Sequence, residues 1–328
     1  MSKMIKKVIS LCLVFLCIGI LCSCKKDNKT KITIIQYVSA SALDDACEGI
    51  IEGLKEAGFV NGENVEIVVQ NPQGDSSTLS IMAKDAVRNS DMIFAIATPA
   101  ALAVQNECKK QKSDVPVLFT AVTDPVSVGL VASNEAPGAN ITGTNDMNPV
   151  KEQVALLKEM KKDAKKIGVL YTSSEPNSTI QVNLVKEMAK EEGLEVVSQS
   201  LTSINDIKVM INALISEGVD AIYLPTDNNI ASAIDSVTNL TNKAGIPTIC
   251  GEEGMIFGGG TITLGINYFN LGKMTGEMAA KVLNGEDISK LSVQGLKNFN
   301  LVINKKKALE NNIVIPEELM ARADTIIE

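Results

Sequence analysis

The side chains best placed for chemistry in this sequence lie in polar turns that directly follow short apolar runs. Thr98 follows the run 92–97, and Asp227 comes shortly after the run 221–224. If these runs are parallel strands, each turn lies at the carboxyl end of a strand, where α/β proteins bind ligands against the first N–H groups of the next helix. Such N–H groups can hold a carboxylate. Asp227 can pair with a ligand ammonium, which is costly to bury without a partner.

We take the polar, aromatic and glycine residues of these turns, with their neighbours, as the candidate ligand-binding site. The candidates are Tyr37, Thr98, Pro99, Ala100, Thr120, Thr123, Asp124, Glu175, Asn177, Ser178, Tyr223, Asp227, Asn228, Gly251 and Glu252. A simpler explanation stays open for several of them. Thr98, Asp124 and Asp227 are also typical helix N-caps, and tyrosine favours strands whether or not it walls a ligand.

Histidine is absent from the 328 residues, which removes several classes of site. Ser-His-Asp and Cys-His catalytic groups and imidazole-ligated metals are excluded. The formal net charge of −8 argues against nucleic-acid binding, which needs a basic surface. No Walker phosphate loop is present, and Cys47, Cys108 and Cys250 lack metal-ligand spacing. We therefore predict a binding protein with no catalytic residue, no metal and no cofactor.

Two similar halves must position these turns. β-branched runs alternate with amphipathic stretches from residue 31 onward, and the pattern restarts near residue 167. Gly58 and Gly193 end equivalent helical stretches, and Ile32 and Ile167 begin equivalent runs. Such alternation predicts an α/β fold with two lobes, each a parallel sheet flanked by helices.

The chain is expected to cross between the lobes more than once. The stretch 140–149 is rich in Gly, Asn and Pro, and further crossings are expected near 265–267 and near Asn298. We therefore expect an N-terminal lobe of 31–143 plus about 267–297. The C-terminal lobe is expected to contain 144–266 plus about 298–328.

The N-terminus is typical of an export signal. A basic start precedes the apolar run 8–21, which is short for a transmembrane helix. The run ends in Leu21-Cys22-Ser23-Cys24, which resembles the bacterial lipobox. That resemblance implies cleavage before Cys24, a diacylglycerol on its thiol, and a tether over 24–30. A plain membrane anchor and a soluble secreted protein remain alternatives.

The whole of the sequence after the leader resembles the tryptophan/tyrosine-type substrate-binding lipoproteins of bacterial ABC importers. The segments that carry the resemblance are Ala42-Leu43-Asp44, Gly53-Leu54-Lys55-Glu56-Ala57-Gly58, Gln70-Asn71-Pro72-Gln73-Gly74-Asp75, Ala95-Ile96-Ala97-Thr98-Pro99, Phe119-Thr120-Ala121-Val122-Thr123-Asp124-Pro125-Val126, Pro137-Gly138-Ala139-Asn140-Ile141-Thr142-Gly143, Glu175-Pro176-Asn177-Ser178, Asp227-Asn228, Gly265-Ile266-Asn267-Tyr268 and Leu301-Val302-Ile303-Asn304-Lys305. One departure concerns the ligand side chain: Ser39-Ala40-Ser41 stands where the family often has Glu-His-Pro.

The resemblance implies a type I periplasmic-binding-protein fold that closes on an aromatic amino acid and delivers it to a membrane permease. The expected partners are thus an aromatic or other apolar L-amino acid, an ABC permease, and the membrane through the lipid. The expected location is the extracytoplasmic face of the cell membrane. A receptor domain of the same fold that signals to a partner protein is the alternative. A tethered enzyme is disfavoured by the missing histidine.

Overall fold

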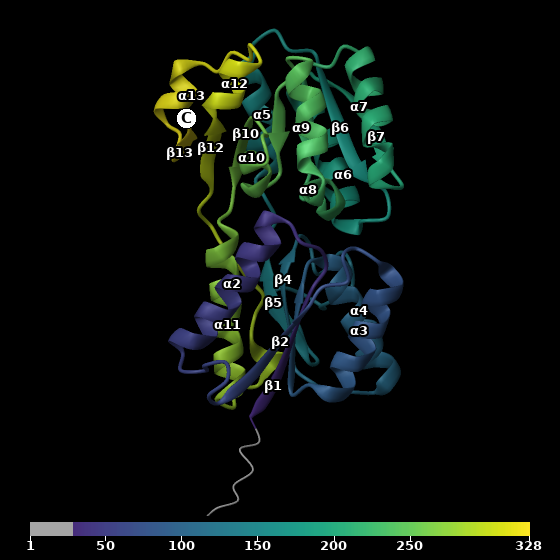
Figure 1. Cartoon of the computed structure of the whole chain (residues 1–328), viewed down its shortest axis with the longest axis vertical. Coiled ribbons are helices and arrows are strands. Elements are labelled where there is room, and N and C mark those ends of the chain that lie inside the picture. The colour runs from purple at the N-terminus through teal and green to yellow at the C-terminus, as the bar shows by residue number, and fades with distance from the viewer. Residues whose placement is uncertain (1–28) are drawn as a thin grey trace, which may run out of the picture.

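The computed structural model describes residues 29–328, which form two α/β lobes stacked along the long axis of the molecule (Figure 1). Residues 1–28, including the predicted signal peptide and Cys24, lie outside the described residues. Each lobe contains one sheet, of six strands in the first and seven in the second. The predicted two-lobed architecture is therefore confirmed.

The first sheet is parallel throughout, because each of its strands is followed by a helix or a long crossover. In spatial order its strands are β11 (Gln294–Gly295), β5 (Ile141–Asn145), β4 (Val117–Val122), β3 (Met92–Ile96), β1 (Thr30–Gln36) and β2 (Val65–Gln70). β3 and β4 are buried at every position, as expected for central strands covered on both faces. The helices around this sheet are α2 (Ser41–Glu56), α3 (Ser76–Asn89), α4 (Thr98–Gln111) and α11 (Tyr268–Leu283).

Helices α2 and α11 pack with their backbones in direct contact, although they are more than 200 residues apart in sequence. A Cβ atom on Gly272 would lie 2.0 Å from the carbonyl oxygen of Ala46, and one on Gly276 would lie 2.4 Å from that of Ile50. Only glycine allows this approach. The late segment that contains α11 is thereby fixed to the first lobe.

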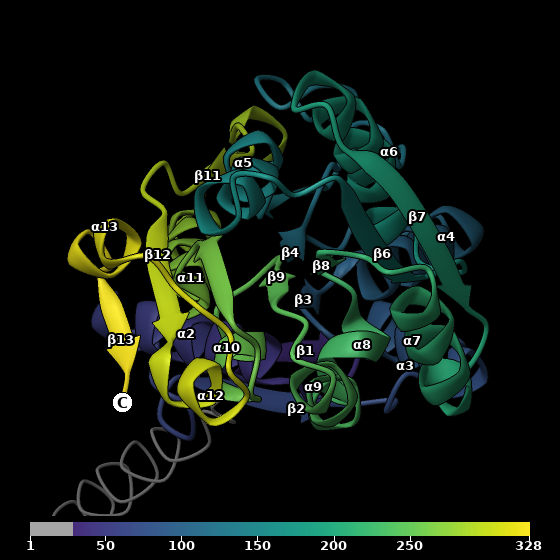
Figure 2. The same ribbon diagram turned by 90° about the horizontal axis from the view of Figure 1, so that it is seen from above.

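The second sheet has one antiparallel pair, between β10 and β12, and is otherwise parallel. In spatial order its strands are β13 (Thr325–Ile327), β12 (Asn300–Asn304), β10 (Ile262–Gly265), β9 (Thr248–Cys250), β8 (Ala221–Leu224), β6 (Lys166–Thr172) and β7 (Glu195–Leu201). Its helices are α5 (Val150–Met160), α6 (Pro176–Glu191), α7 (Ile207–Ser216), α8 (Asn228–Ser232), α9 (Ile234–Lys243), α10 (Gly254–Phe257), α12 (Lys305–Glu310) and α13 (Glu317–Ala321). Short 3₁₀ turns, η1 (Ile204–Asp206) and η2 (Ile288–Lys290), complete the described chain. Figure 2 shows this lobe from above, with β6 and β7 beside α6 and α7.

The chain passes between the two sheets three times within residues 29–328. It does so between Asn145 and Val150, between Gly265 and Tyr268, and between Gly295 and Asn300. The lobe limit expected after Gly143 falls inside β5, because this strand continues its parallel pairing to Asn145. The helical stretch after β8 is divided into two helices, α8 and α9, which meet at Ala233. In the described part of the chain no helix has the length and apolar character that a membrane span requires.

Candidate functional site

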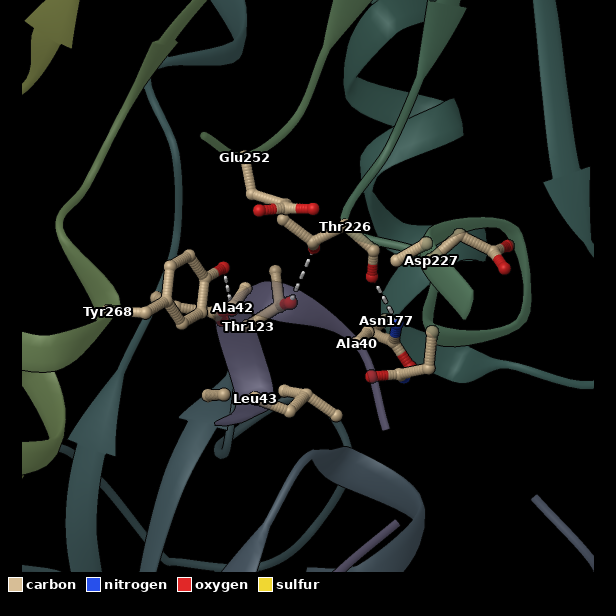
Figure 3. Close-up of a pocket in the computed structure, with 13 residues that line it drawn as sticks. Ala40, Ala42, Leu43, Thr123, Asn177, Thr226, Asp227, Glu252 and Tyr268 are labelled. Atoms are coloured by element: carbon tan, nitrogen blue, oxygen red, sulfur yellow. Dashed lines mark hydrogen bonds between the residues drawn. The ribbon is translucent and has the colours of Figure 1, made fainter. Parts of the chain in front are cut away.

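A pocket lies between the lobes, where the carboxyl ends of strands from both sheets face each other (Figure 3). The empty space between its lining residues, counted together with the part that is open to solvent, is about 340 Å³. Its lining residues are Ala40, Ala42, Leu43, Ala121, Thr123, Asp146, Asn177, Thr226, Asp227, Asn228, Ala231, Glu252 and Tyr268. The hydroxyl oxygens of Thr123 and Thr226 lie 3.4 Å apart and join the two lobes across it.

Asp227 lies between β8 and α8 and is completely buried. Its Oδ1 accepts hydrogen bonds from the Thr172 hydroxyl (2.8 Å) and the Ile230 N–H (3.0 Å). Its Oδ2 accepts from the Thr172 N–H (2.5 Å) and the Ser178 hydroxyl (2.8 Å). These four donors fill the acceptor sites of a carboxylate. Burial raises the pKa of Asp227 above its usual range. Asp227 lines the pocket and is also the N-cap of α8, which is the simpler role that its sequence position suggests.

Glu175 supports the same side of the pocket from behind. Its carboxylate accepts from the backbone N–H and the side-chain amide of both Asn228 and Asn229, at 2.6–3.0 Å. It also accepts from the Asn177 amide nitrogen at 3.1 Å. Burial, followed by the neighbouring Asp227 charge, raises the pKa of Glu175. Glu175 does not line the pocket but orients Asn177 and Asn228, which do.

A second acidic group stands on the opposite side of the pocket, where Figure 3 shows Tyr268 and Glu252. The Tyr268 hydroxyl donates to Asp146 Oδ2 at 2.7 Å, while Asp146 Oδ1 has no hydrogen-bond partner within residues 29–328. Burial raises the pKa of Asp146, and it raises that of Glu252 to about 7. Glu252 accepts from the Gly254 N–H at 2.5 Å. No lysine or arginine is among the lining residues, so the pocket suits a positively charged group on its ligand.

The structure brings five of the sequence candidates to the pocket: Thr123, Asn177, Asp227, Asn228 and Glu252. Several of the other candidates are not part of the pocket lining. Tyr223 is buried in the second lobe, where its hydroxyl donates to Gln153 Oε1 at 2.6 Å, so it does not wall a ligand. Tyr37 donates to the Gly74 carbonyl at 3.2 Å. Asp124 accepts from the Ser127 N–H at 3.0 Å in a turn that no helix follows, so it is not a helix N-cap.

The remaining candidates lie next to the pocket wall. The Thr120 and Thr144 hydroxyls are bonded to each other at 2.9 Å, and Ser178 holds Asp227. Thr98, Pro99 and Ala100 form the first turn of α4 and are absent from the lining. The N-cap of this helix is Ala97, so the alternative role of Thr98 as an N-cap is wrong. Gly251 allows close contact, since a Cβ there would lie 2.6 Å from Thr226 N.

Sequence reasoning found Glu252 but missed the apolar wall of the pocket and Asp146. Ala40, Ala42, Leu43, Ala121 and Ala231 carry no chemical signal of their own. Ala121 has a backbone φ of 55°, which is sparsely populated for alanine and is typical of functional sites, but sequence does not reveal it. Asp146 was expected only as part of a crossing. Among residues 29–328 no group of His, Cys, Asp and Glu could hold a metal ion.

Comparison with known proteins identifies the family. Residues 31–327 match the family described as ABC transporter substrate binding protein. The chain belongs to this family. The predicted resemblance is therefore confirmed, and a family of substrate-binding proteins agrees with the prediction that the chain is not an enzyme.

Two relatives of this substrate-binding family carry names that describe a ligand. The tyrosine-binding protein of Clostridioides difficile is 39% identical over 291 residues, which cover 87% of this chain and 83% of the relative. A solved domain from Streptococcus pneumoniae in complex with L-Trp is 36% identical, with a TM-score of 0.86, and the match covers 92% of this chain and all of that one. A leucine-binding protein from Thermotoga maritima shares the fold, with a TM-score of 0.58 at 18% identity. The match covers 80% of this chain and 85% of that one.

The lobes are arranged as in the ligand-bound relative. A ligand-free, open substrate-binding protein from Clostridium difficile is 38% identical to this chain. The match covers 90% of this chain and 98% of that one, yet the TM-score is only 0.68. The Trp-bound domain, at nearly the same identity, reaches 0.86. Together with the contact between Thr123 and Thr226, this difference indicates that the pocket described here is closed.

Proposed function

We propose that this protein is the lipid-anchored, extracytoplasmic component of an ABC importer and that it binds tyrosine or tryptophan between its closing lobes. Three observations support the proposal: the family match, the names of the relatives, and an acidic pocket with an apolar wall between the lobes. The acidic pocket is the observation that carries it, because an amino acid such as those named for the relatives brings an ammonium group for its carboxylates.

The ammonium is assigned to the side of the pocket that contains Asp146 and Glu252. The sequence suggested Asp227 for this role, but four protein donors already occupy its oxygens. Asp146 Oδ1 is buried and has no partner within the described residues, so an ammonium would complete its hydrogen bonds. The hydroxyls of Thr123 and Thr226 bond to each other at 3.4 Å, which leaves one hydroxyl proton of the pair for the ligand carboxylate.

Calorimetry with the twenty L-amino acids tests the ligand. We expect heat of binding for tyrosine or tryptophan. Binding of a sugar alone, or of no amino acid, would contradict the proposal. Uptake of the same amino acid by cells or vesicles that contain the partner permease tests the transport role, which a signalling receptor would not support.

Substitution of Cys24 tests the anchor. Cys24→Ala is expected to release the protein from membranes or to leave its precursor uncleaved. Cys22→Ala is the matched control, because Cys22 leaves with the predicted signal. Unchanged processing and membrane association in Cys24→Ala would contradict lipidation.

A further inference from the structure

Asn177 presents an unused hydrogen-bond acceptor to the pocket. The side chain belongs to the first turn of α6, is only 3% exposed and lines the pocket (Figure 3). Its Oδ1 has no hydrogen-bond partner in the described part of the chain. Among the buried side-chain oxygens of residues 29–328 that lack a partner, only those of Asn177 and Asp146 belong to residues that line the pocket.

The orientation of this amide is fixed by its surroundings. The Asn177 amide nitrogen donates to the Thr226 carbonyl at 2.8 Å and to Glu175 Oε2 at 3.1 Å. An amide turned by 180° would set its oxygen against a carbonyl and a carboxyl oxygen, so the nitrogen must occupy this position. The free atom is therefore the oxygen, and it requires a donor.

The side chains beside Asn177 make their hydrogen bonds to other groups. The Asn228 amide nitrogen donates to Glu175 at 2.6 Å, and the Ser178 hydroxyl donates to Asp227 at 2.8 Å. Within the described residues no donor reaches Asn177 Oδ1. Because Asn177 lines the pocket, a ligand can supply this donor.

The ligand ammonium does not supply this group. Figure 3 shows Asn177 on the opposite side of the pocket from Tyr268, whose hydroxyl holds Asp146. An amino acid with its ammonium at Asp146 therefore extends its side chain past Thr123 toward Asn177. Ala40 and Leu43 provide apolar surface for a ring along this path.

We infer that Asn177 Oδ1 accepts a hydrogen bond from the far end of the ligand side chain, so that the pocket selects a phenol or an indole over a phenyl ring. This inference rests on the proposed function. A tyrosine hydroxyl and an indole N–H are donors, whereas phenylalanine has none. A site built to hydrogen-bond its ligand discriminates strongly against an analogue that lacks the group, because its own buried polar atom stays unpaired.

The first experiment uses the unmodified protein and a series of ligands. Calorimetry should give tyrosine and 4-aminophenylalanine, which both carry a donor, affinities at least roughly thirtyfold above those of phenylalanine and 4-fluorophenylalanine. Equal affinities for all four would overturn the inference and leave the proposed function intact. Failure of every aromatic amino acid to bind would instead reject the proposed function.

The second experiment replaces the acceptor. Asn177→Leu is expected to bring the ratio of phenylalanine to tyrosine dissociation constants to within about threefold, because neither ligand then meets an acceptor. Asn242→Leu is the matched control: Asn242 is also buried with an unpartnered Oδ1 and an amide nitrogen bonded to a carbonyl, but it does not line the pocket. For Asn242→Leu, the ratio of phenylalanine to tyrosine dissociation constants should equal that of the unmodified protein. An unchanged ratio in Asn177→Leu would overturn the inference, and the ligand series decides the matter if this variant does not fold.

Discussion

Asp227 and Asp146 line the same pocket, and both are almost fully buried, yet their surroundings differ. Asp227 accepts four hydrogen bonds from the second lobe. Asp146 accepts one from Tyr268 on Oδ2 and keeps Oδ1 without a partner within residues 29–328. A carboxylate with filled acceptor sites holds protein structure together. One with a free oxygen is available to a ligand, and position in a pocket does not by itself distinguish them.

The largest expected effect is on stability, at Asp227. Asp227→Asn places an NH₂ group where an oxygen now accepts two hydrogen bonds, so buried donors lose their partner. We expect the free energy of unfolding to fall by about 3 kcal/mol, as measured by denaturant titration. The surviving protein should bind tyrosine with little change in affinity. Normal stability combined with lost binding would reverse the roles assigned to the two aspartates.

The next effect is on binding, at Asp146. Asp146→Asn keeps an oxygen for the Tyr268 hydroxyl but removes the charge that would meet the ligand ammonium. Charge-assisted hydrogen bonds contribute about 1.5–3 kcal/mol, so tyrosine affinity should fall by roughly tenfold to a hundredfold. Calorimetry measures this, with circular dichroism as the control for folding. Unaltered affinity would return the ammonium role to another carboxyl group.

Glu252 extends the comparison to pH. Burial raises its pKa from an ordinary value of 4.5 to about 7. The folded chain therefore favours the protonated form, so the stability that Glu252 contributes is complete below pH 4.5 and is lost as pH rises through about 7. We expect thermal unfolding to show this loss, of about 2–3 kcal/mol, between pH 5 and pH 8. Because Asp146, Asp227 and Glu175 shift in the same direction, the difference from Glu252→Gln isolates the residue. Parallel pH curves for the two proteins would contradict the assignment.

The smallest effect is expected at Ser178. Ser178→Ala removes one of the four donors to Asp227 and should lower the free energy of unfolding by about 1 kcal/mol. Tyrosine affinity should stay within about twofold, since the remaining donors keep Asp227 in place. A loss of affinity comparable with that of Asp146→Asn would show that the carboxylate at 227 also serves the ligand.

The alternation of runs in the sequence was sufficient to predict two α/β lobes, because each buried strand and each amphipathic helix has a local signature. It also located Asp227, which comes three residues after the apolar strand β8. Asp146 directly follows β5, but that strand reads Ile-Thr-Gly-Thr-Asn and is not an apolar run. The partner of Asp146, Tyr268, is 122 residues away in sequence. The break between α8 and α9 at Ala233 also has no sequence signal, since no proline or glycine marks it.

The packing of α11 on α2 has a consequence for the order in which the protein is made. The first lobe lacks the helix that packs on α2, β4 and β5 until the ribosome has passed Leu283, well after the central strands of the second lobe. At about 5–20 residues per second, that delay after β5 lasts on the order of ten seconds. The first lobe is therefore among the last parts of the protein to be completed during translation. The growing chain carries this lobe without its helix α11 for most of the synthesis.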